Sequence, residues 1–158
     1  MTKECKQQFT LRITQANKTE MIVILYEMLL TYLGDAEDAL TQEDLTAFYD
    51  AIRKVRGCLE ELIASLYLNC ELGIRLFSLY QYCNRELIKA DARKKREPLE
   101  HVRSVIEKLR DAYRELAKQD ESGPVMQNSQ TVYAGLTYGK NSLSENMADQ
   151  GTNRGFRA

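Results

Sequence analysis

Residues 21–33, MIVILYEMLLTYL, most constrain what this chain can fold into. Eleven of these thirteen residues are apolar, and only Glu27 and Thr31 interrupt them. A helix at the surface of a small protein needs a single apolar stripe, with polar residues opposite. A helix that crosses a bilayer needs about 20 apolar residues, so this segment is too short to do so. The segment is therefore either a central helix buried on every side or a helix that keeps one side for a partner.

The composition limits the function classes. A chain of 158 residues predicts one domain, with room for a tail. The 22 basic and 23 acidic residues balance, which argues against a protein that binds nucleic acid by neutralising phosphates. The N-terminal residues lack the apolar stretch of a signal peptide. We therefore expect a soluble cytoplasmic protein without a nucleic-acid or membrane partner.

The four cysteines form no closely spaced pair. They are Cys5, Cys58, Cys70 and Cys83. In a cytoplasmic chain, cysteines spaced in this way predict free thiols and no disulfide framework.

Start signals and apolar spacing predict four long helices. Asn17 followed three residues later by Glu20 indicates a capping box, and the first helix is expected over residues 18–40. Thr41 followed by Asp44 indicates the start of the second helix. In that helix, steps of three and four residues make one seam: Leu45, Phe48, Ile52, Val55, Leu59, Leu62 and Leu66.

The third and fourth helices are expected over residues 72–94 and from Glu97-Pro98 to Gln119. The fourth has a single seam, but the third carries two apolar faces. One consists of Leu72, Leu76, Leu79, Cys83, Leu87 and Ala90, and the other of Ile74, Phe77, Tyr80 and Ile88. Short connections between long helices predict an all-α fold, an antiparallel four-helix bundle over residues 17–119. The first and third helices carry more apolar surface than such a bundle requires.

The two ends of the chain differ from the helical region. Residues 1–16 form an N-terminal arm that is either extended or a short helix. Residues 120–158 form a long tail rich in Ser, Asn and Gly, which begins near Ser122-Gly123-Pro124 and is predicted to be mostly irregular. Two interpretations of the tail remain open: a flexible end, or a strap in which residues 132–143 dock in an apolar groove of the same or a neighbouring molecule.

Motifs for catalysis or metal binding are scarce. His101 is the only histidine, which leaves no imidazole-based metal set, and we expect it to be a solvated first-turn residue. Glycine-rich phosphate loops and nucleophile elbows are missing. Arg93, Lys94, Lys95 and Arg96 are interpreted as a charged corner between helices, because acidic residues flank them. We therefore expect no catalytic residues, no metal and no cofactor, and a binding protein instead of an enzyme.

Several short pieces of the chain occur in a familiar order. They are Asn17-x-x-Glu20, Ile24-Leu25-Tyr26-Glu27, Ala36 with Ala39, Leu76-x-x-Leu79-Tyr80-x-Tyr82, Leu87-x-x-Ala90-Asp91, Leu99-x-x-Val102 and Leu109-Arg110. In this order they resemble the flagellar secretion chaperone family FliS, over roughly residues 9–118. There are departures, because the family usually has Trp near Tyr113, a Gly pair where this chain has residues 69–73, and a Tyr in the arm where Phe9 stands here.

The resemblance implies a cytoplasmic export chaperone whose outer grooves hold the disordered C-terminal segment of flagellin before secretion. On the outer faces of the first and third helices, and at the end of the second, the predicted partner-binding residues are Leu25, Tyr26, Leu29, Tyr67, Phe77, Tyr80 and Tyr82. The tyrosines are preferred because their hydroxyls favour a wet edge. The alternatives are core packing for individual residues and, for the protein, a helical adaptor or self-associating structural protein. Weak self-association is compatible with both functions.

Overall fold

A computed structural model describes residues 1–126 of the chain. Five helices account for most of them: α1 (Lys3–Gln15), α2 (Lys18–Thr41), α3 (Leu45–Ala64), α4 (Glu71–Arg93) and α5 (Glu97–Ala117). The described residues contain no strand, so the all-α prediction is confirmed for them. They form one compact unit up to Val125. The predicted docking of residues 132–143, and most of the predicted tail, lie outside the described residues.

The N-terminal arm is the helix α1. The Thr2 side chain caps this helix by accepting a hydrogen bond from the backbone N–H of Cys5 at 3.2 Å. Phe9 is buried with Ala16 and Ile24 in a small hydrophobic cluster separate from the main core. The extended alternative for residues 1–16 is therefore wrong, and the chain has a fifth helix that packs on α2.

The predicted capping box starts α2. The Asn17 side chain accepts from the backbone N–H of Glu20 at 2.8 Å, and the Glu20 carboxylate accepts from the backbone N–H of Asn17 at 2.9 Å. Asp120, which follows α5, also contacts this turn. Its carboxylate accepts a hydrogen bond from the Thr19 hydroxyl, and its backbone carbonyl accepts one from the side-chain amide of Asn17 at 3.2 Å. The first turn of α2 is therefore also where the chain is fixed after α5.

The predicted start of the second helix at Thr41 is wrong. Thr41 is the last residue of α2, and its hydroxyl donates to the carbonyl of Glu37 at 3.0 Å within that helix. The cap of α3 is Asp44, which accepts from the backbone N–H of Ala47 at 2.9 Å. Between them Glu43 adopts a positive φ of 56°, which turns the chain. Asp44, and not Thr41, is the residue that caps α3, so the start of this helix lies three residues later than predicted.

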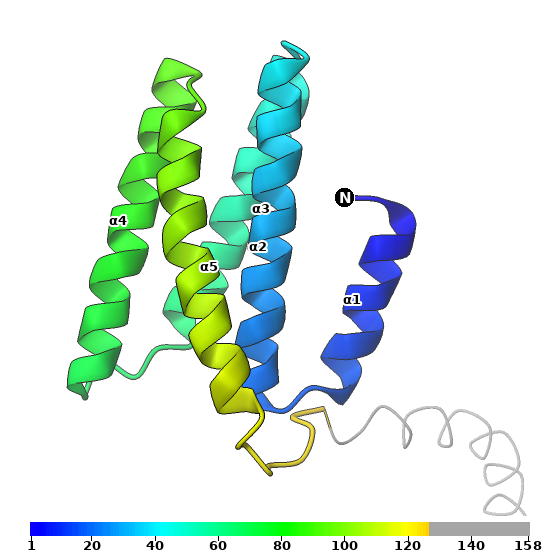
Figure 1. Cartoon of the computed structure of the whole chain (residues 1–158), viewed down its shortest axis with the longest axis vertical. Coiled ribbons are helices and arrows are strands. Elements are labelled where there is room, and N and C mark those ends of the chain that lie inside the picture. Colours follow the sequence, from blue (N-terminus) through cyan, green and yellow to red (C-terminus); the bar gives the residue numbers. More distant parts are fainter. Residues whose placement is uncertain (127–158) are drawn as a thin grey trace, which may run out of the picture. The chain divides into compact units, whose positions relative to one another are not determined.

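Helix α2 lies at the centre of the packing. Figure 1 shows α2 to α5 side by side with successive helices running in opposite directions; α2 packs on α3 and α5, and α4 packs on α5 and less closely on α3. The core between them contains Tyr26, Leu29, Leu33, Phe48, Val55, Leu62, Leu87, Leu99, Val102 and Ile106, each 0% exposed. For residues 21–33, the interpretation as a central core helix is therefore the right one.

Two buried carboxylates tie the helices together. Glu37 of α2 accepts two hydrogen bonds from Arg103 of α5, at 3.1 and 3.0 Å. Glu86 of α4 is 3% exposed and accepts from Lys89 at 2.6 Å, and it lies 2.8 Å from the ring nitrogen Nδ1 of His101 in α5. His101 is therefore exposed, as predicted, but it is also held by a buried carboxylate. Each buried charge has the partner that a charge of this kind requires.

Replacing Glu86 by Gln should make protein stability less dependent on pH. Hydrogen bonds from Lys89 and His101 outweigh burial and lower the pKa of Glu86 below its ordinary value. A carboxylate with a lowered folded pKa stabilises the fold fully above its unfolded pKa, about 4.3 for Glu, and loses this effect as pH falls through the folded value. We expect Glu86→Gln to lower the free energy of unfolding by about 1–3 kcal/mol near neutral pH.

Urea titrations near pH 7 and near pH 3.5 check this prediction. The difference between wild type and Glu86→Gln should shrink at the lower pH. The control is Glu71→Gln, because the Glu71 side chain is 79% exposed and pairs with Arg75 of its own helix. An equal loss of stability at both pH values would contradict the proposed role of the carboxylate charge.

Candidate partner-binding groove

Several large apolar side chains are exposed to solvent where α3 connects to α4. Tyr67 is 69% exposed, Leu68 52%, Leu72 62% and Ile74 54%. Large apolar side chains that lie singly on a surface need no explanation, but a contiguous group marks an interaction site. The α3–α4 connection is therefore a candidate partner-binding surface.

A hollow of about 230 Å³ lies beside these residues. We call it the corner groove and define it by its lining: Lys18, Thr19 and Ile22 of α2, residues 65–67 and Cys70 of the connection, Leu72, Gly73, Leu76 and Tyr80 of α4, and Tyr113 of α5. Three helices and one connection thus form its walls. Most of these side chains are apolar or aromatic, so the groove suits an apolar segment of a partner.

The shape of the groove depends on a tight approach of α4 to the connection. The Cys70 side chain caps α4: its Sγ accepts from the backbone N–H of Gly73 at 3.4 Å and donates to the carbonyl of Tyr67 at 3.4 Å. A Cβ added at Gly73 would lie 1.8 Å from the Tyr67 carbonyl oxygen. Glycine is required at this position because the backbone of the connection occupies the space of any side chain.

Tyr80 and Tyr113 form the floor of the groove, and Tyr26 lies behind them. The hydroxyls of Tyr26 and Tyr80 share a hydrogen bond of 2.5 Å, and the Tyr113 ring meets the Tyr26 ring edge-on, with 5.6 Å between centroids. Burial raises the pKa of Tyr80 to about 12, and it also raises the pKa of Tyr26 and of Tyr113. All three are therefore neutral hydroxyls at physiological pH, and the floor carries no charge.

One cation stands at the rim. The Nζ of Lys18 lies 4.5 Å from the centroid of the Tyr67 ring and donates to the Tyr67 hydroxyl at 3.2 Å. A cation over an aromatic face is attracted by the ring quadrupole, by about 0.5–1 kcal/mol at an exposed site. Lys18 therefore holds the most exposed aromatic ring of the connection over the mouth of the groove.

The structure brings two of the predicted partner-binding residues into the groove, Tyr67 and Tyr80. Phe77 is half-buried on α4, and Leu25 and Tyr82 are half-buried against the core. Whether each of the seven contacts a partner stays a prediction.

The expectation that the tyrosine hydroxyls lie at a wet edge is wrong for Tyr26 and Tyr80. Tyr26 is 0% exposed and Tyr80 1% exposed, and Leu29 is 0% exposed beside them in the core. The reason is that the two hydroxyls satisfy each other, so neither needs water. The rest of each ring can then be buried like any apolar side chain.

Sequence reasoning missed several lining residues, among them Ile22, Leu66 and Leu72. It placed Leu66 on the seam of the second helix and Leu72 on one apolar face of the third by their spacing. Because α3 ends at Ala64 and α4 begins at Glu71, these residues lie where the facing helices have ended or scarcely begun. Position relative to the helix ends, and not spacing, is the signal that could have found them.

The described residues give no support to two other kinds of site. Within residues 1–126, His, Cys, Asp and Glu side chains nowhere gather in threes in a way that would hold a metal ion. Over the same range, each helix falls short of the length and hydropathy that spanning a bilayer requires.

Comparison with known proteins identifies the family. Residues 1–120 match the family described as flagellar protein FliS. One similar relative is the protein named flagellar secretion chaperone FliS from Bacillus subtilis (strain 168); it is 23% identical over 108 residues, which cover 68% of this chain and 81% of the relative. The chain therefore belongs to the FliS family, and the resemblance seen in its sequence is confirmed.

The contact between Gly73 and Tyr67 can be tested with matched glycine substitutions. Gly73→Ala should lower the free energy of unfolding by about 1–3 kcal/mol, the usual cost of forcing atoms into occupied space. Gly57→Ala is the control, because Gly57 is inside α3 and a Cβ there meets nothing within 4 Å. Since Ala forms helices better, this control should be stabilised by about 1 kcal/mol. Thermal melting measures both, and equal effects would contradict the proposed close approach.

The hydrogen bond between Tyr26 and Tyr80 can be tested by a double-mutant cycle. Tyr26→Phe or Tyr80→Phe alone should cost about 1–3 kcal/mol, because it leaves the other hydroxyl buried without a partner. The double variant should cost clearly less than the sum, since it removes both hydroxyls. Urea unfolding measures the four proteins. Additive losses would show that the two hydroxyls do not depend on each other.

Proposed function

We propose that this FliS-family protein is a cytoplasmic export chaperone that binds the C-terminal segment of flagellin in its corner groove and along α4. Family membership supports the general function, because the Bacillus subtilis relative is named a flagellar secretion chaperone. The corner groove and its exposed rim support the location. They are the observation on which this proposal rests.

The outer side of α4 extends the apolar surface beyond the groove. Ile74, Phe77 and Ile88 share one face of the helix by their spacing, and we call them the α4 outer stripe. Ile74 is 54% exposed, Ile88 52%, and Phe77 half-buried. The groove and this stripe together fit an amphipathic helix that lays its apolar face on the protein, with anchors at helical spacing.

An apolar surface of this kind suits a disordered client. Removing apolar surface from water contributes about 25 cal/mol per Å², while ordering a disordered segment costs several kcal/mol. A contact that runs from the groove along the α4 outer stripe provides more area than one pocket could. Its lack of directional polar contacts also lets it accept a helix in more than one register.

The mechanism requires only reversible binding. Flagellin subunits that associate too early could no longer be exported. Covering the C-terminal segment removes the surface through which subunits would assemble, and holding it prevents the segment from folding against other chains. The chaperone releases the client when a later step of export removes it from the binding equilibrium, so the protein needs no bound nucleotide for this role.

The predicted partner-binding residues take different parts in this proposal. Tyr67 and Phe77 contact the client directly, and Tyr80 forms the floor below it. Tyr26 and Leu29 lie behind that floor and hold it in place. Leu25 and Tyr82 support α2 and α4 from their half-buried positions and reach the client only at its edges.

Calorimetry with the isolated C-terminal segment of flagellin tests the proposal. Binding should show a strongly negative heat-capacity change, the sign of apolar burial. Tyr67→Ser and Leu72→Ser should each weaken binding by about tenfold, the effect of losing an apolar contact of about 1.4 kcal/mol. Because both side chains are more than half exposed, their melting temperatures should change little.

Leu45→Ser is the matched control, because Leu45 is 48% exposed at the first residue of α3, at the opposite end from the corner groove. Its affinity should equal that of the wild type. If the flagellin segment binds but all three variants bind alike, the groove is the wrong location. If the segment does not bind and light scattering shows a stable dimer, the protein is instead the self-associating structural protein considered above.

A further inference from the structure

A second hollow, of about 450 Å³, lies where α1, α2 and α5 meet. We call it the N-terminal crevice and define it by its lining: Arg12, Gln15, Ala16, Glu20, Val23, Ile24, Arg114, Ala117 and Lys118. It shares no residue with the corner groove. The two hollows lie on different faces of the first turns of α2, so the crevice can be occupied independently of the groove.

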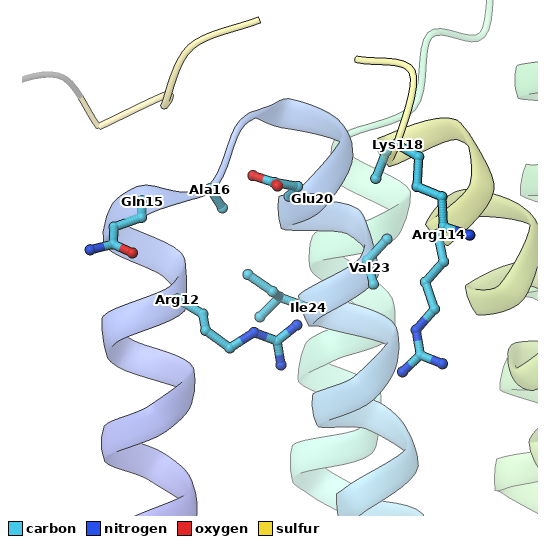
Figure 2. Close-up of a pocket in the computed structure, with 9 residues that line it drawn as sticks. Arg12, Gln15, Ala16, Glu20, Val23, Ile24, Arg114 and Lys118 are labelled. Carbon is cyan, nitrogen blue, oxygen red and sulfur yellow. The ribbon is translucent and has the colours of Figure 1, made fainter. Parts of the chain in front are cut away.

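The floor of the crevice is apolar. Val23 is 6% exposed, and Ala16 and Ile24 are 2% exposed. In Figure 2, Ile24 points from α2 toward α1, and Val23 lies on the side of α2 that faces α5. These side chains are small or branched and leave a shallow surface, which fits the apolar face of a helix better than a single deeply inserted side chain.

The walls of the crevice carry cations from two helices. Figure 2 shows Arg12 reaching from α1 toward α2, while Arg114 and Lys118 lie on the α5 side. Their side chains are about half exposed or more: 47% for Arg12, 46% for Arg114 and 68% for Lys118. Three cations therefore stand within reach of any ligand that rests on the apolar floor.

The carboxylates beside the crevice leave these cations with unused hydrogen-bond donors. Glu27 accepts from Arg12 at 2.5 Å and from Arg114 at 2.7 Å, so one negative charge serves two guanidinium groups. Burial acts to raise the pKa of Glu27, but the hydrogen bonds from the two arginines lower it below its ordinary value, and Glu27 is charged. Each guanidinium has five N–H donors, more than one carboxylate can satisfy.

The other nearby carboxylates change this balance little. Glu20, the one acidic lining residue, already accepts from the backbone N–H of Asn17 in the capping box. Glu115 pairs with Lys118 at 2.7 Å and Asp111 lies 3.6 Å from Arg114, but all four side chains are at least 46% exposed, and such pairs are weak. Among the residues that line the crevice, three cations therefore face one carboxylate, that of Glu20, over an apolar floor.

We propose that the N-terminal crevice binds an acidic amphipathic helix of a partner protein. Its apolar face lies on Ala16, Val23 and Ile24, and its carboxylates bind Arg12, Arg114 and Lys118. Carboxylates accept strong charge-assisted hydrogen bonds from guanidinium groups, as Glu27 Oε1 already does from two nitrogens of Arg114. The apolar floor favours a peptide over a nucleic acid, because a phosphate backbone has no apolar face to cover it.

Fluorescence anisotropy with the full chain and designed peptides tests this proposal. Two labelled helical peptides share one Leu/Ala face and carry either Glu or Gln on the other face. The acidic peptide should bind about tenfold more tightly, and its affinity should fall as salt screens the charges. Lys118→Gln, which does not disturb Glu27, and Arg114→Gln should each weaken acidic-peptide binding several-fold.

Two control variants make the outcome specific. Arg75→Gln removes the same charge from an exposed position on α4, and Tyr67→Ser alters the corner groove; both should bind the acidic peptide like the wild type. Equal affinity for the Glu and Gln peptides, no binding of the acidic peptide, or equal loss in a control variant would overturn the proposal. So would a single-stranded DNA oligonucleotide that binds as tightly as the acidic peptide and displaces it.

Discussion

The need to cover α2 on nearly its whole circumference determines how the rest of the protein is arranged. This helix packs on α1, α3 and α5, and its tyrosines and leucines fill the centre of the core. Its first turn also fixes the chain after α5, because the backbone N–H of Val125 donates to the carbonyl of Ala16 and Asp120 contacts Thr19. Local hydrogen bonds from Ser122 and Thr19 lower the pKa of Asp120 to about 2, so this contact carries a charge at physiological pH. Nearly all the apolar surface of α2 is therefore used inside the protein.

Helix α4, unlike α2, leaves part of its apolar surface exposed to solvent. It packs closely on α5 but less closely on α3, and it begins beyond the end of α3. Leu72, Ile74 and Ile88 consequently remain exposed, although their spacing would suit a core helix. The proposed function depends on this difference between the two apolar-rich helices: α2 provides stability, and α4 provides the surface for a client. A partner can then bind without competing for the contacts that hold the core together.

The sequence predicted features that depend on neighbouring residues. The capping box at Asn17 and Glu20 and the buried part of the α3 seam, residues 48–62, follow from spacing along one helix. The two predicted faces of α4 follow only in part, because Leu72 of one face is 62% exposed and Tyr80 of the other is 1% exposed. The choice between Thr41 and Asp44 as a cap failed because two suitable residues compete within one turn, and only packing of α2 through its last turn decides between them. The sequence did not decide between helix and extended chain for the N-terminal arm, because thirteen residues of helix with one buried aromatic, Phe9, give a weak periodic signal.

The candidate site was harder to predict than the helices. The hydrogen bond between Tyr26 and Tyr80 joins residues 54 positions apart, and such a pairing exists only after folding.

The thiol that caps α4 gives this protein a natural attachment point for a reporter group. Cys70 is exposed on the wall of the corner groove, whereas Cys58 and Cys83 are buried. Burial raises the pKa of Cys58 to about 11 and that of Cys83 to about 12, and thiols react as thiolates. A maleimide dye added near neutral pH should therefore modify Cys70 well before those two. With the half-buried Cys5 replaced by Ser, the chain can in this way carry a fluorophore beside the groove at a cysteine of its own.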